Sequence, residues 1–341
     1  MLRILFAALA VSAISALTFQ PVQAATTLQL DTWISPKHVM NAVVIKTWAA
    51  AVEKASNGRV KVKVSWPPKT HPKTMFDRAA KGIADVTWSF HGYTPGRFVL
   101  TKVIELPGLG ATAEQGSIAY WRVHEKYLAK ANEHKGVKLL GLFTHGPGLI
   151  HSKKPINGPG DLVNKKIRVG GGVMTDIAKA LGVVAVSAPA TKVYQILQQG
   201  VADGVFMPME TKVSLKLFEV ADYSLELPGG LYMGSFFLAM NPKRFAGLSK
   251  QDQDAIMSVS GETFAAMAGK AWADADVSAL KTARAAGNTI KMASTEVQNA
   301  FFAKMNRAKM EADWVAAAGK KGVDGKAALA SLRAEVRKLK K

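Results

Sequence analysis

The chain has 341 residues, no cysteine, 48% hydrophobic and 21% charged residues, and a formal net charge of +20. This composition excludes a disulfide-stabilised scaffold, a cysteine-ligated zinc protein and a disordered chain. A chain of this length buries enough surface to form two compact lobes without disulfides.

Residues 1–24 have the pattern of a secretory signal peptide. Arg3 supplies the positive charge, Ile4 to Leu17 form an apolar run, and Val22-Gln23-Ala24 offers a cleavage site before Ala25. The run is too short to span a bilayer, and no later stretch approaches the roughly 18 apolar residues that a transmembrane helix needs. The sequence therefore predicts an exported protein whose signal peptide is cleaved near Ala24.

The part of the chain that follows the signal peptide alternates strands with helices. Apolar residues alternate or run continuously at 27–33, 60–66 and 82–90, which predicts strands, and they have helical spacing at 41–55 and 74–81. This order is typical of an α/β fold with a mostly parallel sheet, in which ligands lie beyond the carboxyl ends of the strands.

The same pattern restarts near Thr144. Strands are predicted at 137–143, 166–169, 183–187 and 204–207, and helices at 174–181 and 191–199. The run 232–240 predicts a buried strand that returns to the first lobe, and the sequence from Ser249 onward is almost wholly helical. We therefore expect a first lobe of residues 25–143 with about 232–262, and a second lobe of residues 144–231 with the C-terminal helices.

Arg168 is the strongest candidate for binding an acid. It lies at the end of a predicted strand before Gly170-Gly171-Gly172, and its planar guanidinium is suited to grip a carboxylate through two parallel hydrogen bonds. The alternative is an internal ion pair with Asp203 or Glu210, and spacing alone favours neither reading. The glycines before a helix are also suited to bind an anion through backbone N–H groups, but they match neither a Walker motif nor a dinucleotide motif.

Aromatic residues gather just past the predicted strands, where they are suited to cover the apolar body of a ligand. About two-thirds of them are expected in the core. Trp33 and Tyr93 have turn-forming or polar neighbours and are expected to be more open. The candidates for the ligand site, besides Arg168, are Trp33, His38, Trp66, Phe90, Tyr93, His145, Phe206, Met207 and Tyr232.

Little in the sequence indicates an enzyme. The seven histidines show no metal-ligand spacing, and there is no Gly-x-Ser-x-Gly elbow and no cysteine nucleophile. His145 and His151 have donors for an anion, although an isolated histidine more often packs. The basic residues are scattered or lie on the C-terminal helices, so we expect no nucleic-acid partner, no metal and no cofactor, and a field that attracts small anions.

The remaining signal is an ordered series of short motifs: Ser56-Asn57-Gly58-Arg59, Gly82-Ile83-Ala84-Asp85, Ile104-Glu105-Leu106-Pro107-Gly108, Pro155-Ile156, Asp161-Leu162, Lys166-Ile167-Arg168, Leu181-Gly182, Val193-Tyr194, the run 197–204, and Phe218-Glu219-Val220. From about Leu28 to about Ile256, this series resembles the DctP-type substrate-binding proteins of tripartite ATP-independent periplasmic (TRAP) transporters.

The resemblance implies a two-lobed α/β periplasmic binding protein fold with hinge strands and a long C-terminal helical region that spans the lobes. It implies a monomeric periplasmic receptor that closes around a small organic acid and delivers it to a TRAP permease in the membrane. The carboxylate-binding arginine of the family falls on Arg168. A sensor or scaffold protein of the same fold, without a permease, is the alternative.

Two departures from the family pattern bear on the ligand. Where many members carry another arginine shortly before the Pro-Ile pair, this chain has His145-Gly146-Pro147-Gly148-Leu149. Where many members have an asparagine before a proline, this chain has Phe206-Met207-Pro208. These differences favour a monocarboxylate with an apolar or aromatic body over a C4-dicarboxylate.

Overall fold

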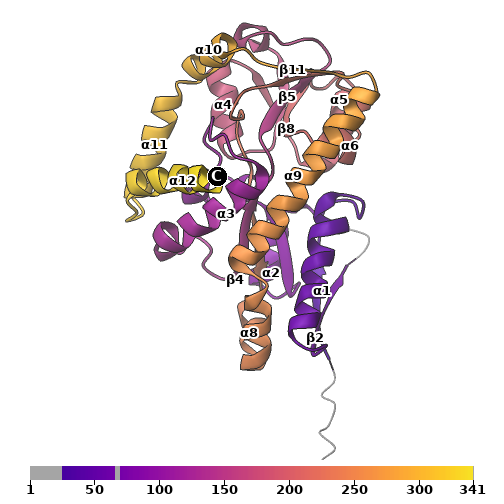
Figure 1. Ribbon diagram of the computed structural model, residues 1–341, viewed down its shortest axis with the longest axis vertical. Helices are drawn as coiled ribbons and strands as arrows, with labels where there is room; N and C mark the ends of the chain where they lie inside the picture. Colours follow the sequence, from indigo (N-terminus) through magenta and orange to yellow (C-terminus); the bar gives the residue numbers. More distant parts are fainter. Residues whose placement is uncertain (1–24, 66–69, 341) are drawn as a thin grey trace, which may run out of the picture.

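A computed structural model describes residues 25–65 and 70–340 (Figure 1). The predicted signal peptide at 1–24 and the site candidate Trp66 lie outside the described residues. The described chain forms two α/β lobes, each built on its own sheet. No helix in the described part of the chain combines the length and apolar character needed to cross a membrane.

The first lobe contains a five-stranded sheet in the order β2-β1-β3-β10-β4. The strands are β1 (Thr26–Asp31), β2 (Val60–Val64), β3 (Val86–Phe90), β4 (Lys138–Thr144) and β10 (Ser235–Met240). The helices that accompany them are α1 (Lys46–Ala55), α2 (Met75–Ala80) and α3 (Ala113–Val123). A capping box formed by Thr112 and Gln115 starts α3, because each side chain bonds the backbone N–H of the other residue.

The second lobe contains a six-stranded sheet in the order β11-β9-β5-β8-β6-β7. The strands are β5 (Gly148–Ser152), β6 (Lys166–Val169), β7 (Val184–Ser187), β8 (Gly204–Pro208), β9 (Tyr223–Glu226) and β11 (Thr289–Met292). The helices here are α4 (Val173–Leu181), α5 (Val193–Gln198) and α6 (Thr211–Ser214).

Both sheets are mixed, whereas the sequence predicts mostly parallel pairing. The strands β1, β2 and β3 run parallel, but β10 is antiparallel to both β3 and β4. In the second sheet β5 is antiparallel to both β8 and β9. The reason is topological: β5 and β10 are the strands through which the chain crosses between the lobes, so they do not follow the right-handed β-α-β connections of their neighbours.

The lobes are joined by residues 145–147 between β4 and β5, by residues 227–234 between β9 and β10, and by the 25-residue helix α9 (Gly261–Ala285). The chain crosses once more, back to the first lobe, near its C-terminal end. Figure 1 shows α9 in orange, running along both lobes. It packs on α3 and β4 of the first lobe and on α6 of the second lobe. These links place the carboxyl ends of the parallel strands of each lobe opposite each other.

The remaining helices are α7 (Pro242–Ala246), α8 (Lys250–Ser258), α10 (Thr295–Met305), α11 (Arg307–Gly319) and α12 (Gly325–Leu339). The last three divide between the lobes, whereas the sequence predicts the C-terminal helices in the second lobe. Of these, α10 lies against the second lobe, but α12 packs on α3 of the first lobe. The Arg122 guanidinium on α3 is 2.9 Å from Glu335 on α12 and 2.7 Å from Glu262 on α9. The apolar face of α12, which contains Leu332 and Val336, is buried in this contact.

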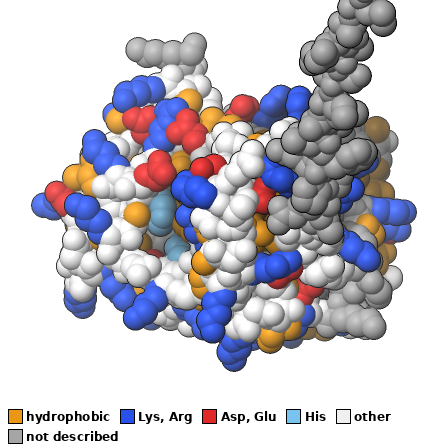
Figure 2. Space-filling model, turned by 90° about the horizontal axis from the view of Figure 1, so that it is seen from below, with side chains coloured by type: hydrophobic (Ala, Val, Ile, Leu, Met, Phe, Trp, Pro, Cys, Tyr) orange, Lys and Arg blue, Asp and Glu red, His pale blue; other side chains and the backbone are white. Residues whose placement is uncertain are grey.

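The surface charge is distributed widely. Figure 2 shows Lys and Arg side chains spread over the face in view and interspersed with Asp and Glu. Three of the ion pairs in the described chain are exposed helical pairs four residues apart: Lys250 with Asp254, Lys270 with Asp274, and Lys309 with Asp313. Such pairs contribute little to stability.

Candidate functional site

A cavity of about 490 Å³, including its mouth, lies between the lobes. The first lobe contributes Trp33, Ile34, His38, Trp88, Phe90, Tyr93 and Phe236; the second lobe contributes Arg168, Gly170, Met174, Ala190, Met207, Pro208, Glu210, Thr211 and Leu215; and the connecting segments contribute His145, Tyr232 and Trp272. Most of these residues lie at or shortly after the carboxyl ends of β1, β3, β6 and β8.

Arg168 lies on β6 and is only 2% exposed. Its Nε and one Nη donate to the carbonyl oxygen of Ala188, at 2.9 and 2.6 Å, which fixes the plane of the guanidinium. Gly170 leaves room for it, since a Cβ there would lie 3.3 Å from Arg168 Nη2.

Neither predicted internal partner of Arg168 pairs with it. Asp203 accepts a hydrogen bond from the backbone N–H of Lys166, and Glu210 lies beside His38. Within the described residues, Arg168 forms no ion pair with any carboxylate. A buried cation without a counter-ion is costly, so the cavity is electrostatically prepared for an anion.

The N-terminus of α4, after the three glycines, binds an anion of the protein itself. Glu105 reaches across from the first lobe and accepts a hydrogen bond from the backbone N–H of Val173, at 2.8 Å. Its other oxygen accepts a hydrogen bond from the hydroxyl of Ser235 on β10. Burial raises the pKa of Glu105, while these hydrogen bonds act in the opposite direction. The glycine segment thus serves contact between the lobes, and its N–H group at Val173 is already occupied.

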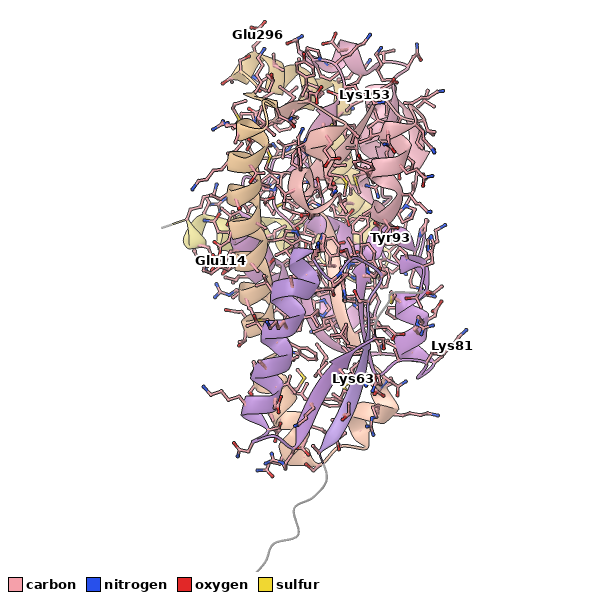
Figure 3. The ribbon with its side chains drawn as sticks, turned by 90° about the vertical axis from the view of Figure 1, so that its right-hand side faces the viewer. Lys63, Lys81, Tyr93, Glu114, Lys153 and Glu296 are labelled. Carbon is pink, nitrogen blue, oxygen red and sulfur yellow. The ribbon has the colours of Figure 1, made fainter. Side chains whose placement is uncertain are left out.

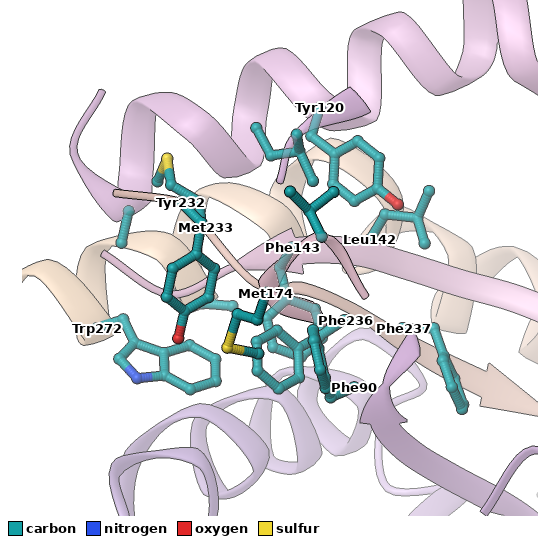
Figure 4. Close-up of a cluster of buried hydrophobic side chains, with 14 of the residues drawn as sticks. Phe90, Tyr120, Leu142, Phe143, Met174, Tyr232, Met233, Phe236, Phe237 and Trp272 are labelled. Carbon is teal, nitrogen blue, oxygen red and sulfur yellow. The ribbon is translucent and has the colours of Figure 1, made fainter. Parts of the chain in front are cut away.

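Aromatic rings form about half of the cavity wall. Trp33 packs on Trp88 at 4.8 Å between ring centroids, and Tyr93 packs edge-on against Phe90 at 5.2 Å. Figure 4 shows Phe90, Met174, Tyr232, Phe236 and Trp272 gathered together. Figure 3 shows Tyr93 at mid-height, between the two lobes. Trp33 and Tyr93 are 5% and 6% exposed, so they are buried rather than open as predicted, because the second lobe covers them.

His145 lines the cavity, but both of its ring nitrogens already have partners. Its Nδ1 lies 2.5 Å from the carbonyl oxygen of Gly146, and its Nε2 accepts a hydrogen bond from the backbone N–H of Gly234 at 3.0 Å. Burial lowers the pKa of His145 to about 4. The ring is therefore neutral near pH 7 and has no free N–H for an anion.

A second polar group consists of His38 and Glu210, which line the cavity, and Asp276, which lies behind Glu210. Glu210 Oε1 lies 3.6 Å from His38 Nε2, and the backbone N–H of Glu210 donates to Asp276 at 2.8 Å. Burial acts to raise the pKa of Glu210, but His38, Ser214 and Trp272 lower it below its ordinary value. Burial and the nearby Glu210 raise the pKa of Asp276 well above its ordinary value. Glu210 is thus the ionised carboxylate of the group.

The structure brings most of the predicted site residues into one cavity and leaves some out. Arg168, Trp33, His38, Phe90, Tyr93, His145, Met207 and Tyr232 all line it. Phe206 does not: side chains alternate along β8, so Phe206 points away from the face on which Met207 lies, and its carbonyl accepts a hydrogen bond from the Tyr232 hydroxyl.

Two other side chains with N–H donors, His151 and Arg97, lie away from the cavity. His151 is buried in the second sheet with Ser224 Oγ 2.8 Å from its Nδ1, so it is not placed to bind a ligand there. Arg97 forms an ion pair with Asp77 at 2.8 Å and packs over the Phe76 ring.

Several lining residues were not selected from the sequence. Glu210 follows the carboxyl end of β8 by two residues, and a position just after a strand end is one at which the sequence could have indicated a site residue. Trp272 lies on α9, more than sixty residues later in the chain, and no local pattern distinguishes it from a core residue. Phe236 and Met174 read as ordinary core positions in a strand and a helix.

Contacts between the lobes surround the cavity. The Tyr93 hydroxyl of the first lobe accepts a hydrogen bond from the backbone N–H of Ala190 in the second lobe, at 3.0 Å. Lys102 and Asp176 form an ion pair at 3.1 Å across the same boundary. A Cβ on Gly171 would lie 2.1 Å from the carbonyl oxygen of Gly92, so the two backbones approach too closely for any other residue. These contacts depend on the lobes being together.

No group of three or more potential metal ligands occurs among the described residues. The polar groups of the cavity are instead one guanidinium, one carboxylate and the hydrogen-bonding atoms of aromatic side chains.

Residues 31–312 match the model of family 7 of the bacterial extracellular solute-binding proteins, the DctP family. A protein of Comamonas testosteroni described as the outer membrane transporter protein TsaT is 32% identical over 313 residues, which are 91% of each chain.

Solved structures extend this similarity to the fold. A TRAP periplasmic solute-binding protein of Bordetella bronchiseptica with bound (R)- and (S)-mandelate is 42% identical, with a TM-score of 0.89 over 92% of this chain and 99% of that one. A TRAP solute-binding protein of Rhodoferax ferrireducens with copurified benzoate is 29% identical, with a TM-score of 0.85 over 92% and 98%. A marine metagenome protein with 3-hydroxybenzoate is 31% identical, with a TM-score of 0.86 over 94% and 100%.

Proposed function

The chain belongs to family 7 of the bacterial extracellular solute-binding proteins, the DctP family, and from this premise we propose that it is the periplasmic receptor of a TRAP transporter for an aromatic monocarboxylate. Its role is to bind the acid between its lobes and deliver it to the membrane permease, without chemical change of the acid. The signal peptide is cleaved near Ala24 on export, and the receptor acts as a monomer.

The observation that carries the proposal is the unpaired Arg168 guanidinium at one side of an otherwise largely aromatic cavity. Two of its N–H groups are fixed on Ala188, and its remaining donors have no hydrogen bond within the described part of the chain. A carboxylate supplies the missing counter-charge and two acceptor oxygens. The similar proteins with mandelate, benzoate and 3-hydroxybenzoate support an aromatic body for the ligand.

A C4-dicarboxylate is a poor match for the same cavity. Among the described residues that line the cavity, Arg168 is the one lysine or arginine. Glu210 is buried there, and its pKa is lowered. A second carboxylate on the ligand would therefore face apolar rings or a like charge, and both are unfavourable.

Ligand binding is proposed to favour the closed arrangement of the lobes. Arg168, Met207 and Glu210 belong to the second lobe and Trp33, Phe90 and Tyr93 to the first, so only the closed arrangement places both sets on one ligand. A ligand shifts the population of a conformation by its difference in affinity for the two states. A permease then recognises the closed form.

A thermal shift screen tests the proposal. A ligand at 100 times its dissociation constant adds about 2.7 kcal/mol to the native state, which raises the melting temperature of a protein of this size by a few degrees. Benzoate, mandelate and phenylacetate are compared with succinate and malate. The proposal predicts larger shifts with the aromatic acids, and it is refuted if succinate or malate gives the largest shift. Loss of uptake of the best acid in a deletion strain separates a transport receptor from a sensor or scaffold.

A further inference from the structure

Two buried polar atoms at the cavity wall have no hydrogen-bond partner within the described residues: Glu210 Oε2 and Trp272 Nε1. Glu210 is 3% exposed and Trp272 is 2% exposed, and both line the cavity. Unsatisfied polar groups at such burial are costly, and native proteins usually satisfy them through water or a ligand. They therefore need an explanation that core packing does not supply.

The other indole and phenol groups of the cavity are already engaged. The N–H of Trp33 donates to the Trp88 carbonyl at 3.1 Å, and the N–H of Trp88 bonds Thr32 at 3.2 Å. The Tyr232 hydroxyl donates to the Phe206 carbonyl at 3.1 Å. Besides the free donors of Arg168, Glu210 Oε2 and Trp272 Nε1 are thus the buried side-chain atoms of this wall that lack a partner within the described residues.

Glu210 and Trp272 lie close to each other. The Trp272 side chain is one of the groups that hold the pKa of Glu210 below its ordinary value. His38, whose Nε2 lies 3.6 Å from Oε1, packs edge-on against the Trp272 ring with 6.0 Å between ring centroids. The backbone N–H of Met40 donates to His38 Nδ1 at 3.1 Å, which leaves the proton on Nε2, facing Glu210. His38 thus serves Oε1, whereas Oε2 lies near the Ser214 hydroxyl and the Trp272 N–H but forms no hydrogen bond with either of them within the described residues.

We propose that the acid bound by this protein carries a hydroxyl group, which donates to Glu210 Oε2 and accepts from Trp272 Nε1 while Arg168 holds its carboxylate. A hydroxyl is a donor and an acceptor at once and so matches both free atoms, whereas an ammonium group has no acceptor for the indole N–H. The ligand class is then a hydroxylated aromatic monocarboxylate. This inference rests on the proposed function and adds to it the residues that discriminate between aromatic acids.

A site built to bond a hydroxyl discriminates against the analogue that lacks it, because its polar groups are then left unpaired. A hydrogen bond to a charged group corresponds to roughly a tenfold to hundredfold difference in affinity. The alternative is that the Ser214 hydroxyl and the Trp272 N–H donate to Oε2 themselves. In that case a hydroxyl group on the ligand would not increase its affinity. Affinities for matched acids separate these two readings.

The experiment is calorimetric titration of the full-length mature protein, freed of ligand by dialysis, with two matched pairs: mandelate against phenylacetate, and 3-hydroxybenzoate against benzoate. We expect the hydroxylated acid of at least one pair to bind ten times more tightly or better. In Glu210→Gln and in Glu210→Met this ratio should fall to about threefold or less. The second variant removes the acceptor entirely, in case the amide of the first still bonds the hydroxyl.

Glu105→Gln is the matched control, since it makes the same change at another buried carboxylate that lies between the lobes and outside this cavity wall. It should lower both affinities of a pair by the same factor and leave their ratio unchanged. Equal affinities within both pairs, or an unchanged ratio in both Glu210 variants, would overturn the inference. Tighter binding of phenylglycine than of mandelate would overturn the proposal that the ligand carries a hydroxyl group, and would indicate an ammonium group instead. If no aromatic acid binds the unmodified protein, the proposed function itself fails.

Discussion

Replacing Arg168 separates its two possible roles, which are binding the carboxylate and stabilising the fold. The guanidinium is 2% exposed, bonds only the Ala188 carbonyl within the described chain, and has no carboxylate partner there. In the ligand-free protein its charge is therefore uncompensated, and its removal relieves a desolvation cost. In the complex, the same removal leaves the buried carboxylate of the ligand unpaired.

The magnitudes follow from these two states. Loss of one member of a desolvated charge pair costs about 2–5 kcal/mol of binding free energy, so Arg168→Ala should weaken affinity by roughly 30-fold to several thousand-fold. Arg168→Met retains most of the apolar stem, and it gives up only the hydrogen bonds to Ala188, worth about 1 kcal/mol. Its ligand-free melting temperature should therefore change by no more than about 4 °C. Arg168→Lys should recover only part of the affinity, because a point charge lacks the fork that holds both oxygens.

Calorimetric titration with the best aromatic acid gives the affinities, and calorimetric melting without ligand gives the stabilities. Near-normal affinity in a folded Arg168→Ala protein would refute the carboxylate role. A large drop in the ligand-free melting temperature of both Arg168→Met and Arg168→Lys would show instead that Arg168 stabilises the fold.

Three further predictions concern closure, pH and processing. Gly171→Ala should weaken the binding of every ligand at least tenfold, because its Cβ would lie 2.1 Å from the Gly92 carbonyl across the lobes, while Gly158→Ala, in open space, should bind normally in the same titration. Burial lowers the pKa of His151 to about 3, so the unfolded chain binds an extra proton below about pH 6.5 and the native state loses stability as the pH falls from there towards 3. Denaturant unfolding gives the free energy of unfolding of His151→Gln and of the unmodified protein at each pH. Between pH 7.5 and pH 5 the unmodified protein should lose about 2 kcal/mol more of this free energy than the variant does. An equal loss in the two proteins would contradict the prediction. N-terminal sequencing of periplasmic protein should begin within a residue or two of Ala25, and an intact Met1 in that fraction would refute cleavage.

Sequence periodicity identified the elements that carry their own pattern. Helix α4, with its apolar face and Gly182 at its C-terminus, and the strands β6 and β8 fall where they were predicted. The strands β5, β9 and β11 were missed, because they are short and their pairing partners are distant in sequence. Short segments of this kind are determined by tertiary contacts rather than by local propensity.

The same distinction applies to the site. Arg168 was predicted as a site residue because a strand end followed by glycines is a local signal and strand ends converge on one crevice in α/β folds, and it lines the cavity. Phe206 and Met207 are neighbours in sequence, and only the register of β8 decides which of them faces the cavity. Trp272 comes from a helix whose position depends on packing across both lobes. The sequence indicated that the N-terminus of α4 is suited to bind an anion. Only the folded structure shows that the carboxylate of Glu105, from the other lobe, lies there.

The central claim is that an aromatic monocarboxylate occupies the cavity between the lobes with its carboxylate on Arg168. The most direct measurement is a crystal structure of the protein with the best acid from the thermal screen. The account predicts the carboxylate within hydrogen-bond distance of the Arg168 Nη atoms and the ring among Trp33, Phe90 and Phe236. A carboxylate bound by a different cation, or an acid bound outside this cavity, would contradict it.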